Sequence, residues 1–154
     1  MKRSAVGLIS WIAVCMAAGW IGSRFTPGEW YASLAKPAWN PPDSVFGPVW
    51  STLYVLMGVA AWLVWRKAGF AGARVAIGLF IIQLFLNSLW SFLFFGVHQP
   101  GLAFIEMLVL WLVILATTTG FWRVSVPAGI LLLPYLCWVG FAIALNFELW
   151  RLNS

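Results

Sequence analysis

The sequence predicts an all-α membrane protein in which five transmembrane helices form one bundle. Of the 154 residues, 63% are hydrophobic and only 8% are charged, whereas soluble domains carry about 25% charged residues. So few charges cannot cover a folded surface in water, so the lipid bilayer must be the solvent for most of that surface. The apolar runs do not alternate with polar residues, which favours helices over the strands of a membrane barrel.

Five runs are long enough to cross a bilayer, which takes about 20 residues of helix. The first follows two basic residues and is longer than the apolar core of a cleaved signal peptide, so we expect it to be retained. "FTPGEW" ends the first run, "RKAGFAGAR" separates the second and third, "GVHQPG" separates the third and fourth, and Pro127 suits the first turn of the fifth. The expected helices occupy residues 5–23, 44–65, 75–95, 102–121 and 127–147 of one domain, residues 1–154.

Lysine and arginine are unevenly divided between the two sides of this bundle. Six lie at the N-terminus and in the loops after the second and fourth helices: Lys2, Arg3, Arg66, Lys67, Arg74 and Arg123. Three lie on the opposite side: Arg24, Lys36 and Arg151. The positive-inside rule therefore predicts a cytoplasmic N-terminus, with the loop between the first and second helices on the other side. Basic residues at helix ends also predict contact with membrane lipid headgroups and no nucleic-acid partner.

A stretch rich in proline, "KPAWNPPD", precedes the second helix. Proline fixes its own φ and restricts the residue before it, so Pro37, Pro41 and Pro42 predict a stiff, extended segment over residues 36–43. Asp43 or Ser44 is expected to cap the helix that follows. This segment could fold over the helix ends as a lid on a ligand cavity, or it could be an interfacial loop that anchors the bundle. Its shape alone favours neither reading.

Polar and aromatic side chains recur at helical spacing inside three of the expected helices. In the third helix every fourth residue is polar: Gln83, Asn87 and Ser91. Polar groups are costly in lipid, so this stripe should face the bundle interior, either as ligand contacts or as interhelical hydrogen bonds. The second and fifth helices carry aromatic faces at similar spacing: Trp50 and Tyr54, and Tyr135, Trp138, Ala142 and Asn146.

Conventional catalytic and metal-binding sets cannot be assembled from this sequence. The only histidine, His98, falls in a loop, and glycine-rich phosphate loops and carboxylate pairs are missing. Cys15 and Cys137 lie inside apolar runs and predict neither a disulfide nor a metal site. Hydrolytic or metal-assisted catalysis is therefore poorly supported, and enzyme activity of another kind is left open.

Three stretches resemble the tryptophan-rich sensory protein/translocator protein family, once called peripheral benzodiazepine receptors. They are "EWYASLAKPAWNPPDSVFGPVWSTLY", "LNSLWSFLFF" and "PYLCWVGFAIALN", and the resemblance covers about residues 5–151. It implies a five-helix bundle, usually a homodimer, with a ligand cavity beneath the loop that joins the first two helices. It also implies that no cofactor is required and that the ligands are porphyrins, such as protoporphyrin IX or haem, and synthetic isoquinolines or benzodiazepines. The absence of extensions at either end is expected of a bacterial member.

Carried over residue by residue, the resemblance places ten residues in the ligand pocket. They are Tyr31, Leu34, Pro41, Pro42, Phe46, Trp50, Asn87, Trp90, Trp138 and Ala142. Trp50 and Trp138 match tryptophans implicated in the light-dependent degradation of protoporphyrin IX by some bacterial members. The sequence departs from the sterol motif of animal members, because Phe147 and Glu148 stand where tyrosines would occur. This departure puts sterol binding in doubt.

The resemblance therefore implies a membrane receptor or sensor for a tetrapyrrole or a related hydrophobic ligand, with photochemical porphyrin degradation as a second activity. The alternative is a transporter that moves such molecules across the membrane. Secondary transporters tend to show internal repeats and broken helices, and the sequence shows neither. The small residues Gly69, Ala73, Ala76 and Gly78 predict a dimer surface at the start of the third helix.

Overall fold

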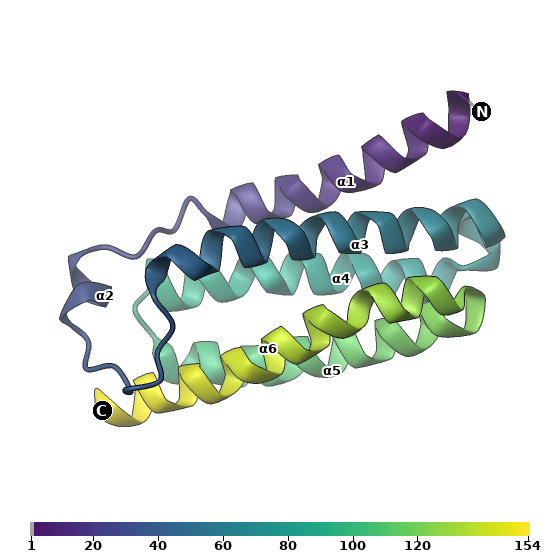
Figure 1. Cartoon of the computed structure of the whole chain (residues 1–154). Helices are drawn as coiled ribbons and strands as arrows, with labels where there is room; N and C mark the ends of the chain where they lie inside the picture. The colour runs from purple at the N-terminus through teal and green to yellow at the C-terminus, as the bar shows by residue number, and fades with distance from the viewer. Residues whose placement is uncertain (1) are drawn as a thin grey trace.

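The computed structural model describes residues 2–154, with side chains from residue 4, and confirms the all-α architecture. This part of the chain contains no strand, and five of its helical segments are long and apolar enough to cross a membrane. A short helix precedes the second long one, and a π-helical turn extends the third (Figure 1). The elements are α1 (Lys2–Gly22), α2 (Glu29–Ser33), α3 (Asp43–Gly72), α4 (Arg74–Ser91), η1 (Phe92–Gly96), α5 (Pro100–Val124) and α6 (Val126–Leu152).

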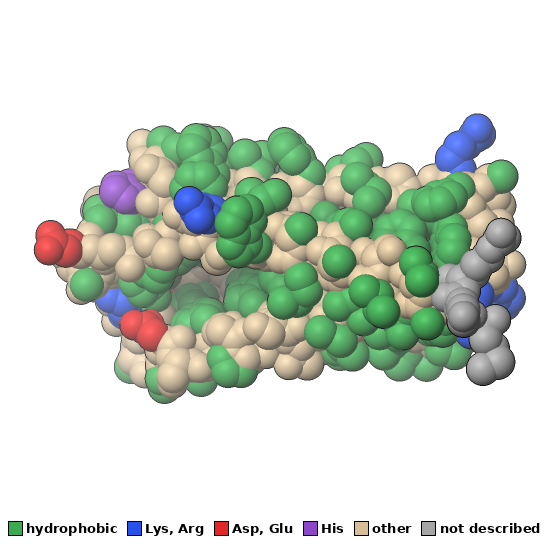
Figure 2. Space-filling model, turned by 90° about the horizontal axis from the view of Figure 1, so that it is seen from above, with side chains coloured by type: hydrophobic (Ala, Val, Ile, Leu, Met, Phe, Trp, Pro, Cys, Tyr) green, Lys and Arg blue, Asp and Glu red, His purple; other side chains and the backbone are tan. Residues whose placement is uncertain are grey.

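The five long helices lie side by side, and each runs opposite to the one before it (Figure 1). With five crossings the two termini lie at opposite ends of the bundle, and α2 lies at the end that holds the C-terminus. Figure 2 shows that charged side chains on one face gather at the two ends, with hydrophobic side chains between them. That pattern is expected of a protein whose middle is solvated by lipid. Which end faces the cytoplasm stays a prediction of the charge count.

The long helices extend further than the sequence predicts, most clearly in α3. The stretch "RKAGFAGAR", expected to be a loop, remains helical to Gly72, and only Ala73 separates α3 from α4. Arginine, lysine and alanine are good helix formers, so the helix continues where it leaves the hydrocarbon. Gly69 interrupts it with a φ of +66°. Glycine adopts this left-handed conformation without the Cβ clash that other residues meet, which permits the sharp reversal into α4.

The helix starts follow the proline rules, but one expected cap is wrong. Pro100 and Pro127 lie in the first turns of α5 and α6, where a missing N–H is harmless. The N-cap of α3 is Pro42, and no side chain caps this helix. Asp43 is instead the first helical residue, where its carboxylate still faces the positive end of the helix dipole.

Two of the four residues of the predicted dimer surface, Ala73 and Ala76, are buried inside a single chain. Ala73 and Ala76 are only 3% and 7% exposed within one chain. Ala76 packs against α5 at Gly120, where an added Cβ would lie 3.1 Å from the Cβ of Ala76. Small residues allow close helix approach inside a monomer as well as between monomers, and sequence cannot separate the two uses. The homodimer itself stays a prediction.

Gly58 sets the closest approach between α1 and α3. A Cβ at position 58 would lie 2.6 Å from the Cα of Ile12, which is backbone and cannot move aside without shifting α1. The two helices therefore touch through their main chains at this point. This contact fixes α1 against the bundle midway along its length.

We expect Gly58→Ala to destabilise the bundle by about 1–3 kcal/mol, because the added methyl group overpacks the α1–α3 contact. Gly78→Ala is the matched control, since a Cβ there meets no heavy atom within 4 Å. The control should be neutral or slightly stabilising, because alanine is the better helix former by about 1 kcal/mol. Thermal unfolding in detergent measures both. Equal midpoints for the two variants would contradict the close approach.

Candidate functional site

A cavity of about 710 Å³ lies at the end of the bundle that carries α2. Its walls come from α1, α3, α4, α5 and α6, and the segment between α1 and α3 covers its outer end. Sites for small organic molecules usually measure about 300–1,000 Å³ and are lined mainly by apolar and aromatic groups. The size and lining of this cavity place it in that class.

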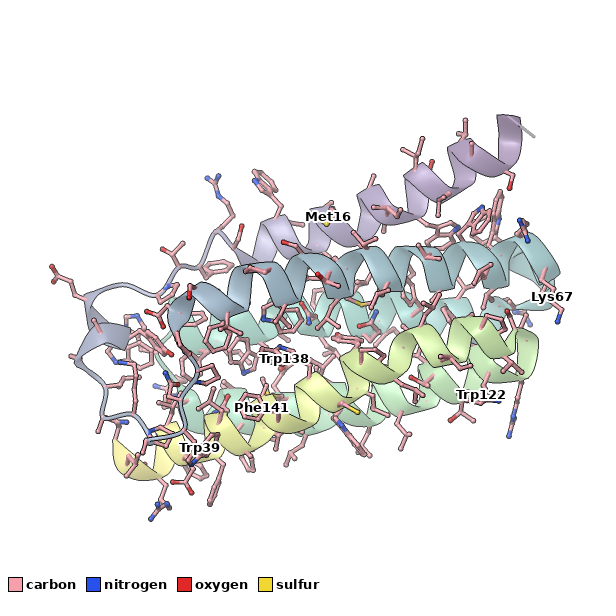
Figure 3. All side chains as sticks on the ribbon, viewed as in Figure 1. Met16, Trp39, Lys67, Trp122, Trp138 and Phe141 are labelled. Atoms are coloured by element: carbon pink, nitrogen blue, oxygen red, sulfur yellow. The ribbon has the colours of Figure 1, made fainter. Side chains whose placement is uncertain are left out.

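Aromatic rings form most of the wall. Trp50 stacks on Tyr54 with ring centroids 5.7 Å apart, and Trp90 stacks on Phe94 at 5.1 Å. On α6, Trp138 meets Phe46 edge to face at 6.0 Å. Figure 3 shows Trp138 between α6 and α3, with Phe141 and Trp39 nearer the lid end. Three indoles from three helices therefore surround one space.

A chain of buried hydrogen bonds begins at the cavity, which Tyr54 and Asn87 line, and continues beneath it to Tyr135 and Gln83. The Tyr54 hydroxyl donates to Asn87 Oδ1 at 2.6 Å, and Asn87 Nδ2 donates to the Tyr135 hydroxyl at 3.1 Å. The Tyr135 hydroxyl in turn donates to Gln83 Oε1 at 2.7 Å. We name Tyr54, Asn87, Tyr135 and Gln83 the polar floor. It joins α3, α4 and α6 in the membrane interior, where an unpaired polar group would be costly.

Two further polar groups lie beside the cavity. The Trp90 indole N–H donates to Asn146 Oδ1 at 2.9 Å, and Asn146 Nδ2 donates to the main-chain oxygen of Pro100 at 2.8 Å. This pair holds Trp90 against α6 and the start of α5. The indole N–H of Trp138, by contrast, is buried and finds no acceptor among residues 4–154. Since buried donors are normally paired, Trp138 is left with one hydrogen bond to offer.

The lid, residues 23–42, is packed onto the bundle and is more than an interfacial anchor. Trp30 stacks on His98 of the α4–α5 connection at 4.3 Å. Asn153 forms a two-way amide clamp with Ala35: the Ala35 N–H donates to Asn153 Oδ1 and Asn153 Nδ2 donates to the Ala35 oxygen, both at 2.9 Å. Within the lid, Lys36 Nζ donates to the Tyr31 main-chain oxygen at 2.8 Å. Such contacts fix the lid over the outer end of the cavity.

Tyr31 points inward from the lid and is buried. Its ring meets Phe94 and Phe95 edge to face, at 6.3 and 5.6 Å. Burial, reinforced by the nearby Asp43 carboxylate, raises the pKa of the Tyr31 hydroxyl above its ordinary value. The lid therefore presents a neutral phenol to the cavity.

Comparison with known proteins identifies the family to which this fold and cavity belong. The model of the TspO/MBR family matches residues 11–151, which is most of the chain. The chain belongs to the TspO/MBR family.

Relatives from bacteria and animals support this assignment over nearly full length. The tryptophan-rich protein TspO of Chlorobaculum tepidum is 44% identical over 99% of both chains. The translocator protein of Homo sapiens is 46% identical over 86% of this chain and 82% of its own. The tryptophan-rich sensory protein of Cereibacter sphaeroides is 40% identical over 94% of this chain and 90% of its own.

Seven of the ten residues expected in the TspO/MBR pocket line the cavity: Tyr31, Phe46, Trp50, Asn87, Trp90, Trp138 and Ala142. Leu34, Pro41 and Pro42 do not. Leu34 packs into a cluster with Tyr31 and Leu145, and Pro42 is the N-cap of α3. The prolines shape the lid from outside the cavity, because their fixed φ directs the chain back toward α3. The ligand-binding role of all ten stays a prediction.

Sequence reasoning missed the contribution of α1 to this cavity. The cavity is lined on this side by Met16, Gly19 and Trp20. These residues lie in an apolar run in which no polar residues recur at helical spacing, so the sequence does not indicate which face points inward. It also missed Phe94 and Phe95, which η1 turns toward the lid. Lys36 and Asp43 line the cavity as well, and their charges next to a proline-rich stretch were the available signal.

We expect Asn87→Leu to destabilise the protein by about 1–3 kcal/mol, because it leaves the buried Tyr54 hydroxyl without its acceptor. Tyr54→Phe removes the same hydrogen bond from the other side. The double variant should therefore cost less than the sum of the two single changes, as expected of directly coupled residues. Chemical unfolding in detergent measures all three. Strict additivity would show that the two side chains are not paired.

Proposed function

We propose that this TspO/MBR chain is a membrane receptor or sensor, acting as a homodimer, that binds porphyrins and related flat hydrophobic molecules in the cavity beneath the lid. One observation carries the proposal: three indoles, Trp50, Trp90 and Trp138, surround a covered space of about 710 Å³. The names of two relatives, "tryptophan-rich sensory protein" and "translocator protein", support a role in sensing or translocation.

The chemistry of the cavity fits a tetrapyrrole. A porphyrin is a large planar π-system, and indole offers the largest apolar surface for stacking on it. Trp138 lines the cavity, and its buried indole N–H has no acceptor among the described residues, which leaves a donor beside the cavity. At the outer end the Lys36 ammonium lines the space, donates to two main-chain oxygens and lies 4.5 Å from the centroid of the Tyr31 ring, with no carboxylate paired to it among the described residues. It is therefore placed to meet the propionate carboxylates of protoporphyrin IX or haem.

Photochemical degradation of the bound porphyrin is the finer part of this proposal. Indole is the most easily oxidised side chain in the wall, and Trp50 and Trp138 are the indoles that match the tryptophans implicated in other members, so they are the residues that we expect to react with an excited porphyrin in the presence of dioxygen. Trp50 also stacks on Tyr54 and meets Tyr135 edge to face at 6.2 Å. Trp50 on α3 and Trp138 on α6 both line this space, so a bound ring is within reach of both indoles.

Titration with protoporphyrin IX in the dark tests the receptor function. The wild-type protein should bind saturably, as followed by quenching of tryptophan fluorescence. Ala142→Thr should weaken binding about tenfold, because a β-branched side chain would overpack the cavity wall. Ala116→Thr on the exposed face of α5 is the matched control and should bind normally. The absence of saturable binding to the wild type would overturn the proposed function.

Illumination of the same complexes in air tests the photochemistry. Trp50→Phe and Trp138→Phe keep an aromatic ring but lose the easily oxidised indole. Each should weaken dark binding slightly and slow the loss of the porphyrin absorption bands much more. Trp122→Phe at the opposite end of the bundle is the control (Figure 3). Wild-type degradation by the double Trp50→Phe, Trp138→Phe variant would rule out these residues, and parallel losses of binding and degradation would leave a binding role only.

A further inference from the structure

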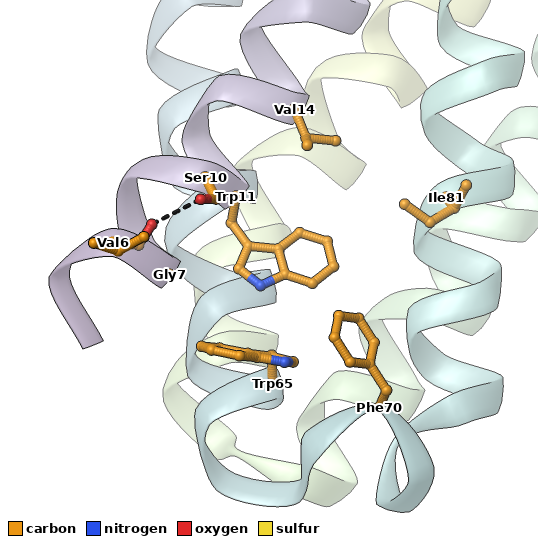
Figure 4. Close-up of a pocket in the computed structure, with 8 residues that line it drawn as sticks. All are labelled: Val6, Gly7, Ser10, Trp11, Val14, Trp65, Phe70 and Ile81. Carbon is orange, nitrogen blue, oxygen red and sulfur yellow. Dashed lines mark hydrogen bonds between the residues drawn. The ribbon is translucent and has the colours of Figure 1, made fainter. Parts of the chain in front are cut away.

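A second hollow lies at the other end of the bundle, outside the cavity just described. We call it the α1 groove; it measures about 610 Å³, and its walls come from α1, α3 and α4 (Figure 4). None of its lining residues belongs to the ligand cavity. They are Val6, Gly7, Ser10, Trp11, Val14, Trp65, Phe70 and Ile81.

The α1 groove exists because α1 and the reversal into α4 enclose a space between them. Figure 1 shows the N-terminal half of α1 diverging from the bundle. Gly7 lets the Trp65 indole lie close to α1, since a Cβ at position 7 would be 2.5 Å from the Trp65 ring. Phe70, placed by the Gly69 kink, packs on Trp65 at 6.1 Å and on Trp11 at 6.2 Å. Three aromatic rings thus form one end of the groove (Figure 4).

The walls of the groove suit hydrocarbon. The only hydroxyl, that of Ser10, donates to the Val6 main-chain oxygen at 2.8 Å and is therefore used within α1 (Figure 4). The other polar lining groups are the indole N–H groups of Trp11 and Trp65, which are of the kind that meets ester oxygens at the membrane boundary. Val6 and Phe70 on the rim are each 62% exposed. The groove therefore opens sideways from the single chain, on a surface that lipid solvates wherever no second copy covers it.

The charged side chains at this end of the bundle are basic. Arg66 and Lys67 directly follow Trp65 in α3, and Arg74 begins α4. The only ion pair within residues 4–154 joins Arg151 and Glu148 at the lid end. The acidic residues all belong to the lid half of the bundle: Glu29, Asp43, Glu106 and Glu148. Positive charge beside the groove is therefore unbalanced, and it complements an anionic headgroup.

We propose that the α1 groove binds one acyl chain of an anionic phospholipid. The chain lies against Trp11, Trp65 and Phe70, and the headgroup lies beside Arg66 and Lys67. The lipid comes from the leaflet on the side of the 66–74 turn, whichever compartment that side faces. Along α1 the groove runs from Val6 to Val14, about 12 Å at 1.5 Å per residue, which accommodates part of an acyl chain. This site does not depend on the porphyrin cavity.

Native mass spectrometry of the full chain in neutral detergent tests the site. Titration with dioleoyl-phosphatidylglycerol should give one saturable adduct, about tenfold tighter than with dioleoyl-phosphatidylcholine. Arg66→Gln should bring the two affinities within a few-fold of each other. Arg123→Gln, at the same end but on α5, should leave the difference unchanged. Equal binding of the two lipids by the wild type would overturn the proposal.

Filling the groove provides the second test. Ser10→Phe places a ring in the space while removing no contact between helices, and it should abolish the saturable adduct. Thr119→Phe is the matched control, because Thr119 is an exposed residue of α5 whose hydroxyl likewise bonds the main chain four residues earlier. An unchanged adduct in Ser10→Phe would place the lipid elsewhere. A shift from dimer to monomer in Ser10→Phe, with the lipid adduct unaffected, would show that a second copy occupies the groove and would overturn the lipid site.

If Ser10→Phe unfolds, Arg66→Gln still decides the question, because Arg66 contacts only the Trp62 ring, 4.5 Å away, among the interactions that the structure defines. Thermal unfolding of each variant, compared with that of Thr119→Phe, separates misfolding from loss of binding. Unaltered preference for phosphatidylglycerol in folded Arg66→Gln would contradict the placement of the headgroup.

Discussion

The polar floor is the constraint on which the architecture of the cavity depends. In hydrocarbon each hydroxyl and amide must find a partner inside the protein, and Tyr54, Asn87 and Tyr135 satisfy one another across three helices. Three of the indoles that line the cavity, Trp50, Trp90 and Trp138, each lie one helical turn from a member of this floor. Trp50 precedes Tyr54 by four residues, and Trp90 and Trp138 follow Asn87 and Tyr135 by three. Because α3 runs away from the lid and α4 and α6 run toward it, all three indoles project on the lid side of the floor.

The opposite ends of the bundle use the same residue types for different purposes. At the lid end, tryptophans surround an enclosed space whose outer boundary is a packed loop with a lysine and an aspartate. At the other end, Trp11 and Trp65 line a groove that is open to the side. The charged residues beyond this groove are all basic. The abundant tryptophan of this chain is therefore divided between two separate hollows. The surrounding charges and the degree of enclosure distinguish the covered cavity from the open groove.

The sequence predicts those features of the structure that produce a periodic residue pattern or a distinctive residue composition. Few charges and long apolar runs give the five spans, and fourfold spacing gives the inward face of Gln83 and Asn87. The continuation of α3 to Gly72 was missed because a basic, glycine-containing stretch is read as a loop, although its residues tolerate a helix. Ala76 was assigned to a dimer surface, whereas it packs against α5 of its own chain. The sequence does not separate these two roles, because small residues serve contacts within and between chains alike. No sequence pattern indicated that α1 lines the cavity, because the apolar run of that helix has no distinct polar face.

The amide clamp between Asn153 and Ala35 joins residues 118 positions apart in sequence. Helices of a multi-pass protein enter the bilayer in succession, so α1, the lid and α3 are in place before α6 exists. Until α6 is inserted, the lid lacks the clamp and the floor lacks Tyr135, so the cavity is neither closed nor complete. The covered cavity is thus completed late in biogenesis, and a nascent chain paused before α6 would expose the indoles of α3 and α4 to the membrane interior.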